Sequence, residues 1–173
     1  MTCPTLEIGS IIVPQQGRHT FEQEYEDLQG LSFNRVANGN GILRNTWSGK
    51  ISTTIIGRGW APSAFANLAT GTTHVVKCAI PRAASSNTTT VTLPASRRSD
   101  PGHTPRGWAL VDAVLVETTI SGVSGDDYTL DAVAGAQGYR VTYFPQITAA
   151  ITVNEGSGEN TGSYEWRVQA EEI

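Results

Sequence analysis

Short runs of β-branched and aromatic residues, each ended by glycine, proline or asparagine, recur about every eight to fifteen residues along this chain. This spacing is typical of sandwiches and barrels of antiparallel strands, because it leaves no room for the helices that connect parallel strands. The 21 Thr, 13 Ser and 18 Gly also favour strands and tight turns over helices rich in Leu, Glu and Lys. We therefore predict an all-β fold, either an antiparallel β-sandwich or a barrel-like domain.

The strongest hairpin signal lies in the first third of the chain. Residues 31–36 alternate between apolar and polar, Asn38-Gly39-Asn40-Gly41 tolerates positive φ, and residues 42–47 resume extended character. The β-branched run 50–56 follows, so we expect the hairpin to grow into a three-stranded antiparallel meander over residues 31–56. The other predicted strands are 6–13, 18–26, 74–80, 88–93, 108–118, 128–133, 138–144, 147–153 and 164–170.

Two segments differ from this pattern of short strands. Residues 108–118 are nearly continuous in apolar side chains, which predicts the longest strand, covered on both faces at the centre of the core. Ser63 offers a helix N-cap, and Phe65 and Leu68 lie three residues apart, so they would share one helical face. The sequence therefore predicts one short helix near residues 63–69.

Three polar segments are predicted to lack strands. Residues 82–87 and 95–106 are expected to be loops, the second long enough to form a contact. Residues 154–162 are glycine-rich, and we expect a turn that becomes ordered only against a neighbour. At 173 residues the chain is long enough for one core, so we predict a single domain over residues 1–173, with a weak lobe boundary near 95–106.

Composition excludes several partners. No stretch approaches the roughly 18 apolar residues that span a bilayer, and Met1–Pro4 lacks the basic and apolar regions of a signal peptide. We expect neither membrane insertion nor signal-directed secretion. A net charge of −4 argues against a nucleic-acid partner. The two cysteines, Cys3 and Cys78, suit a chain made in a reducing cytoplasm, and a single bridge between them stays open.

No metal or cofactor site is predicted. The three histidines, His19, His74 and His103, are far apart and have no metal-ligand spacing. The acidic turn around Asp126 and Asp131 lacks the twelve-residue spacing of calcium loops. We expect no bound cofactor.

The sequence also lacks the motifs that are typical of common hydrolases. No Gly-x-Ser-x-Gly motif is present. Glu22, Glu24 and Glu26 would alternate onto one face of a strand, whereas glycosidases need two opposed carboxylates. We interpret the three as a solvated face and predict that the protein is not an enzyme.

Four residues are candidates for contacts with a neighbour. Arg97, Arg98 and Arg106 form the only basic concentration, and their guanidinium groups suit carboxylates on an adjacent subunit. Trp60 lies on a turn next to Pro62, where a large ring favours an interface. Trp60 could alternatively stack on a sugar ring.

Five blocks of the sequence stand out in order, and none is a catalytic signature. They are Leu31–Thr53 with Asn38-Gly39 and Trp47, Ile56–Pro62, Leu93–Arg98, Val133–Gln146 and Ala170–Ile173. Together these blocks resemble a family of small proteins encoded in the tail modules of siphophages and related prophages of Gram-negative bacteria.

The resemblance implies a structural component of the virion, a minor tail protein at the distal tail tip or baseplate. Its partners would be other tail proteins, from the tube, hub or fibres, in a homo-oligomeric ring or a hetero-assembly. The protein would be made in the host cytoplasm and reside in the tail. Two alternatives stay open: a virion adhesin that binds a host-surface glycan or receptor through Trp60 and residues 95–106, and a small cell-wall hydrolase that uses the Glu22–Asp27 cluster.

Overall fold

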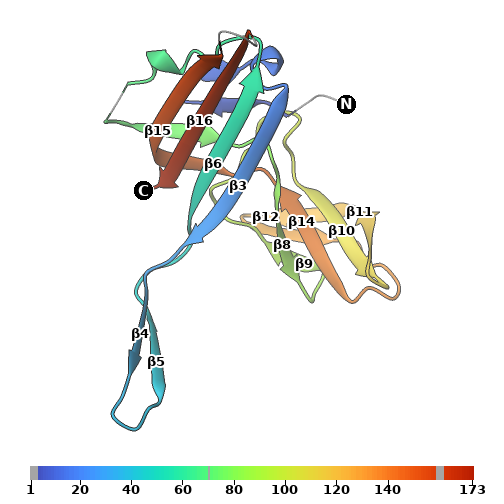
Figure 1. Cartoon of the computed structure of the whole chain (residues 1–173). Helices are drawn as coiled ribbons and strands as arrows, with labels where there is room; N and C mark the ends of the chain where they lie inside the picture. Colours follow the sequence, from blue (N-terminus) through green and yellow to red (C-terminus); the bar gives the residue numbers. More distant parts are fainter. Residues whose placement is uncertain (1–3, 70, 159–161) are drawn as a thin grey trace. The chain divides into compact units, whose positions relative to one another are not determined.

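The computed structural model describes residues 4–69, 71–158 and 162–173, and strands make up most of them (Figure 1). Every strand pair for which the register is defined is antiparallel. The fold is therefore all-β, as predicted, and fits a sandwich or barrel-like arrangement.

The strands are β1 (Leu6–Ile8), β2 (Ile11–Val13), β3 (Thr20–Leu28), β4 (Leu31–Arg35), β5 (Gly41–Asn45), β6 (Lys50–Gly59), β7 (Thr73–Lys77), β8 (Arg82–Ser86), β9 (Thr90–Thr92), β10 (Arg106–Val111), β11 (Val114–Thr118), β12 (Ile120–Ser124), β13 (Asp127–Leu130), β14 (Gly138–Tyr143), β15 (Gln146–Gly158) and β16 (Ser163–Glu172).

Contacts divide the chain into two compact units. The first comprises Met1–Ile12 and Val75–Ile147, and the second comprises Val13–His74 and Thr148–Ile173. The chain passes from one unit to the other three times, so neither unit is a continuous segment. The boundary expected near residues 95–106 is not where the chain divides, because that loop lies within the first unit.

The second unit is built on a sheet in the order β15-β16-β6-β3 (Figure 1). Alternation along each strand gives this sheet one buried and one exposed face. On the buried face the indole of Trp166 packs edge-on against Phe65, with ring centroids 5.3 Å apart, and its N–H donates to the carbonyl of Gly17 at 2.7 Å. Gly57 is required beside this ring, since a Cβ at that position would collide with the indole.

The first unit contains the sheets β11-β10-β14-β8 and β12-β13-β9, together with the antiparallel pair β1–β7. Side chains of β9, β10, β13 and β14, with Leu93 just after β9, form its core, which includes three tyrosines. The buried members are Val91, Leu93, Ala109, Tyr128, Leu130, Tyr139, Val141 and Tyr143.

The prediction of one long core strand over residues 108–118 is wrong. The segment is a hairpin, β10–β11, turned at Asp112 and Ala113, whose φ angles are 48° and 66°. Residues of β11 are mostly exposed, so the apolar run does not form a strand covered on both faces. Periodicity could not reveal this turn, because Asp-Ala is a weak turn signal compared with Asn-Gly.

The expected meander over residues 31–56 and the expected loop at 82–87 are also wrong. β4 and β5 pair with each other, but β6 pairs with β3 and β16 instead of with β5. Residues 82–86 form the strand β8, which pairs with β14. Small residues such as Ala and Ser give weak strand signals. β8 forms because it pairs with β14 at the edge of the sheet, and not because its residues have a high strand propensity.

Residues 154–158 belong to β15, whose pairing with β16 runs as far as Gly158 and Ser163, so the turn expected from residue 154 does not begin there. Residues 159–161 of that prediction lie outside the described residues. The short helix near residues 63–69 is present as a single 3-10 turn, Phe65–Asn67. Its N-cap is Ala64 in the left-handed region, and Ser63 does not cap it as expected.

Candidate functional site: an exposed hairpin

The most unusual feature of the second unit is the hairpin β4–β5, which extends beyond the ends of β3 and β6 (Figure 1). All five residues of each of its strands are exposed. At its base the Gly30 N–H donates to the Trp47 carbonyl at 2.9 Å, and the Thr46 N–H donates to the Gly30 carbonyl at 2.9 Å. The hairpin therefore continues the β3–β6 pair outward as a two-stranded arm.

Local chemistry explains why the arm forms. Asn38 Oδ1 accepts the Asn40 N–H at 3.1 Å, and Gly39 takes a φ of 84° that a residue with a side chain rarely adopts. The Gly39 N–H donates to the Val36 carbonyl at 2.8 Å. The predicted turn is thus confirmed.

The two faces of the arm differ in chemistry. Leu31, Phe33 and Leu43 share one face, since Phe33 lies opposite Leu43 in the register and Leu31 lies two residues before Phe33. Phe33 is 58% exposed and Leu43 is 64% exposed. The guanidinium of Arg35 lies 5.5 Å from the centroid of the Phe33 ring, on this same face. The opposite face carries mainly polar side chains: Ser32, Asn34 and Arg44, with Ile42.

This amphipathic pattern is the one that a half-buried strand uses against a core. Covering the remaining exposed parts of the three apolar side chains would contribute about 2.5–5 kcal/mol, at about 1.5–3 kcal/mol for complete burial of each. An isolated two-stranded hairpin is at best marginally stable in water. The arm therefore has the chemistry of a contact surface.

A second surface lies on the exposed face of the β15-β16-β6-β3 sheet. Glu22, Glu24 and Glu26 point outward from β3, where the register places Ile56 opposite Glu22. Among the described residues none of these three carboxylates has an ion pair. A pocket of about 280 Å³ lies at one end of this row, lined by Thr20, Glu22, Ile56, Gly57, Arg58 and Glu165. The solvated acidic face expected from the sequence is present, and the carboxylates are neighbours on one strand.

Trp60 is exposed, as its prediction as a contact residue requires. It is 68% exposed and stacks on His19, with ring centroids 5.8 Å apart and an angle of 17° between the rings. The two rings help to line a pocket of about 330 Å³ together with Arg58 and Ser163. Arg58 donates to Ser163 Oγ and forms an ion pair with Glu165 at 3.2 Å.

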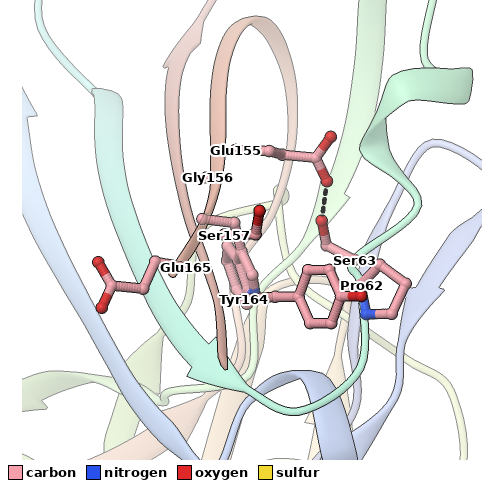
Figure 2. A pocket seen from close by; sticks show the side chains of 8 residues that line it. Pro62, Ser63, Glu155, Gly156, Ser157, Tyr164 and Glu165 are labelled. Carbon is pink, nitrogen blue, oxygen red and sulfur yellow. Dashed lines mark hydrogen bonds between the residues drawn. The ribbon is translucent and has the colours of Figure 1, made fainter. Parts of the chain in front are cut away.

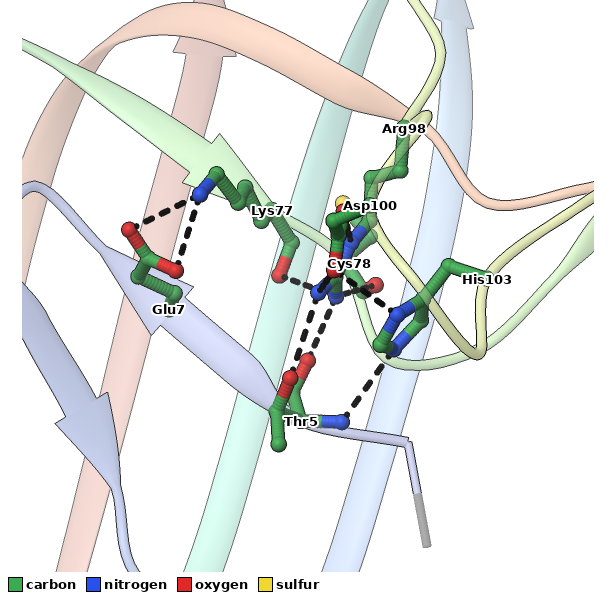
Figure 3. Close-up of polar contacts among 7 residues, drawn as sticks. All are labelled: Thr5, Glu7, Lys77, Cys78, Arg98, Asp100 and His103. Carbon is green, nitrogen blue, oxygen red and sulfur yellow. Dashed lines mark hydrogen bonds and ion pairs between the residues drawn. The ribbon is translucent and has the colours of Figure 1, made fainter. Parts of the chain in front are cut away.

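Arg98, another candidate contact residue, is buried, with 1% of its side chain exposed (Figure 3). It donates to both oxygens of Asp100, at 2.8 and 2.6 Å, and to the carbonyls of Thr5 and Cys78, at 2.6 and 2.9 Å. These contacts lie within the first unit and leave its guanidinium no room for a neighbouring subunit. Cys78 is buried, and Cys3 lies outside the described residues.

Arg97 is likewise engaged within the first unit. Its guanidinium donates to Asp126 Oδ1 at 2.6 Å and to the Pro94 carbonyl at 2.6 Å, and it lies 5.4 Å from the centroid of the Tyr128 ring. Burial works to lower the pKa of Arg97, but the hydrogen bonds with Asp126 and Tyr128 outweigh it and raise that pKa. Arg106, at the start of β10, is exposed. Of the three arginines predicted as contacts, Arg106 is the one that faces solvent.

Asp100 and His103 complete the Arg98 cluster. The two hydrogen bonds from Arg98 lower the pKa of Asp100 to about 2. Burial, followed by the charge of Arg98, lowers the pKa of His103. The Thr5 N–H donates to His103 Nε2 at 3.3 Å, and His103 Nδ1 lies 2.9 Å from Asp100 Oδ2. The Nε2 atom of this buried imidazole accepts the Thr5 backbone N–H, so His103 acts as a structural group that ties the loop to the start of the chain.

A third pocket, of about 260 Å³, contains a serine beside a carboxylate (Figure 2). The Ser63 hydroxyl donates to Glu155 Oε1, and the Phe65 N–H donates to the same oxygen at 3.3 Å. Glu155 thus holds the start of the 3-10 turn, and no histidine is among the described residues that line the pocket and could activate the serine. Sequence reasoning missed this role, because the two residues are 92 positions apart.

Over residues 4–69, 71–158 and 162–173, no group of three or more His, Cys, Asp or Glu side chains could hold a metal ion. No helix in the same ranges is long and apolar enough to cross a membrane. Comparisons with protein-family models, with curated proteins and with solved structures found no match. Function must therefore be argued from the surfaces described above.

Proposed function

We propose that this protein is a non-enzymatic structural component of a bacteriophage tail, at the distal tail tip or baseplate, where it assembles with neighbouring tail proteins. The observation that carries the proposal is the arm β4–β5, whose apolar face is exposed in the isolated chain. The arm falls within Leu31–Thr53, one of the blocks in which the sequence resembles tail-module proteins.

Assembly chemistry supports this proposal. A subunit of a particle needs rigid sheets and a surface that gains its cover only on assembly. The exposed Phe33 and Leu43 provide such a surface. Arg35 lies on the same face, and its positive charge would favour a partner that carries negative charge. The buried Arg98 cluster, by contrast, ties the 95–106 loop to the backbone of Thr5 and Cys78 and keeps the scaffold rigid.

The test is incorporation into particles. In the phage or prophage that encodes the chain, gradient-purified virions are analysed by quantitative mass spectrometry, and immunogold labelling locates the protein. We expect a fixed copy number per particle at the tail tip. Absence from purified virions would refute the proposal.

A matched pair of variants tests the arm itself. The double substitution Phe33→Ser and Leu43→Ser removes apolar surface from one face, and we expect a loss of incorporation of at least about tenfold, equivalent to about 1.4 kcal/mol of contact energy. The control Ile42→Ser changes an exposed side chain on the opposite face and should leave incorporation close to that of the unsubstituted chain. Equal effects of the two variants would contradict the role of the apolar face.

The exposed Trp60 favours a second candidate function, an adhesin module of the virion. Its indole and His19 line an open pocket beside Arg58, an arrangement that suits the flat face of a sugar ring. Binding of the purified chain to host envelope polysaccharide, measured by glycan array, would support this function if Trp60→Ala abolished it and Trp47→Ala did not. Binding that is equal in both variants would argue against it.

A further inference from the structure

We propose that the partner covering the arm is a second copy of this chain, so that the arm of one copy lies across the acidic outer face of the β3–β6–β16 sheet of the next. This inference rests on the proposed function, since it names the partner within that assembly. It commits to a head-to-tail contact between two different surfaces of the same protein.

Opposite charge on the two surfaces is the first argument. Residues 31–45 contain Arg35 and Arg44 and no acidic residue, which gives the arm a charge of +2. Since the whole chain carries −4, the rest of the molecule carries −4 − 2 = −6. An arm of this sign is attracted to the remainder of another copy and is repelled by another arm.

The receiving face is chemically matched to the arm. Glu22, Glu24 and Glu26 form a row along β3, and Ile56 lies beside it with 43% of its side chain exposed. On the arm, Arg35 lies on the same face as Phe33, which places a positive charge directly beside apolar surface. The receiving face also carries Lys50, Arg58 and Arg167, together with Glu165 and Glu171, so its side-chain charges sum to 3 − 5 = −2. Its net charge is therefore opposite in sign to that of the arm.

The arm cannot reach this row within its own copy. β4 follows β3 after two residues, and the pairing of Gly30 with Trp47 and Thr46 holds the arm as an outward extension of β3–β6. Folding it back over Glu22–Glu26 would break both hydrogen bonds at its base. The contact must therefore be intermolecular.

The size of the contact predicts its strength. One face of a two-stranded hairpin with five residues per strand measures roughly 17 Å by 10 Å, well below the approximately 800 Å² that each partner buries in a standard interface. A single contact is therefore weak. In a closed ring each copy makes two such contacts, one with its arm and one with its sheet, so assembly depends steeply on protein concentration.

Sedimentation of the purified chain over a concentration series tests the inference. We expect reversible association that weakens as salt is raised, because the charges are exposed. Arg35→Glu and Glu24→Lys should each raise the apparent Kd at least about tenfold, because each places like charges opposite one another in the contact. The control Arg44→Glu, on the polar face of the arm, should have a smaller effect than Arg35→Glu.

Mixing the two charge-reversal variants provides the decisive result. The glutamate introduced at position 35 of one variant can pair with the lysine introduced at position 24 of the other, while the unchanged Arg35 and Glu24 pair in the reverse contact. We expect the equimolar mixture to recover the association that each variant lacks alone. Failure of the mixture to recover would overturn the inference, as would loss of association in Arg35→Glu with full retention in Glu24→Lys.

The failure of this inference and the failure of the proposed function can be told apart. A chain that is monomeric at every concentration but is found in purified virions would overturn self-association and leave the tail function in place. A chain that associates as expected but is absent from virions would overturn the tail function alone.

Discussion

Replacing the buried Arg98 with methionine tests whether the first unit depends on a charged cluster. Methionine has a long, unbranched and apolar side chain, so Arg98→Met removes the charge and the hydrogen bonds while keeping much of the volume. The substitution leaves the carbonyls of Thr5 and Cys78 without this donor, and it deprives Asp100 of its guanidinium partner (Figure 3).

The magnitude follows from what remains buried. Breaking a buried ion pair by removing one partner costs about 3–5 kcal/mol. About a third of the Asp100 side chain is exposed, so water can hydrate part of its charge, which places the loss at the lower end of that range. The two carbonyls add to the loss, because unsatisfied buried acceptors cost about 1–3 kcal/mol each. With about 3 kcal/mol for the broken ion pair and about 1 kcal/mol for each carbonyl, we expect the free energy of unfolding to fall by about 5 kcal/mol.

Equilibrium unfolding in urea, followed by circular dichroism, measures this loss. Arg106→Met is the matched control, because Arg106 is exposed, and its effect should stay within about 0.5 kcal/mol. The double variant Arg98→Met with Asp100→Asn should recover part of the loss, since it also removes the unpaired carboxylate. A loss below about 1 kcal/mol for Arg98→Met would refute the reasoning.

The contacts described above lead to three more predictions. The pKa values of His103 and Asp100 are lowered in the folded chain, so the unfolded chain binds more protons as the pH falls. For His103, the free energy of unfolding should decrease as the pH falls below about 6.5. For Asp100, it should decrease again from about pH 4 down to the folded pKa of about 2. Urea unfolding across this range checks it, and His103→Gln should flatten the upper part of the slope. Gly57→Ala should destabilise the second unit by about 2 kcal/mol or more, because the new methyl group collides with the Trp166 indole. The control Gly156→Ala has open space around it and should not destabilise the unit. Melting temperatures of both variants, measured by thermal unfolding, test this difference. Phe33→Ser with Leu43→Ser should leave the free energy of unfolding of the monomer unchanged within about 0.5 kcal/mol, and a large shift would show that the arm is part of a core.

Sequence patterns predicted strands well where side chains alternate and a turn is explicit. The hairpin at 31–45 is the clearest case, because Asn38-Gly39 specifies its turn and the flanking residues alternate. The same pattern contained no information on which strand would pair with β6, since pairing depends on a register shared with β3 and with the distant β16. Local propensity finds strands, and long-range contacts select their partners.

The candidate contact residues show a similar division. Trp60 was predicted from its place on a turn, and it is exposed. Proximity in sequence groups Arg98 with Arg97 and Arg106, yet the side chain of Arg98 is buried. The acceptors that make this burial favourable, Thr5 and Cys78, are 93 and 20 residues away. No one-dimensional pattern contains such a contact.

The groups that stabilise the fold and the groups that we propose for assembly lie in different parts of this chain. The first unit buries a charged cluster around Arg98, while the second unit leaves Phe33 and Leu43 in solvent. Substitutions in the first group should act on folding, and substitutions in the second should act on the proposed contact with a neighbour. A variant that folds with wild-type stability but fails to assemble should therefore map to the arm or to the acidic row on β3. If such variants mapped instead to the 95–106 loop, the contact surface would lie in the first unit, and the arm would lose its assigned role.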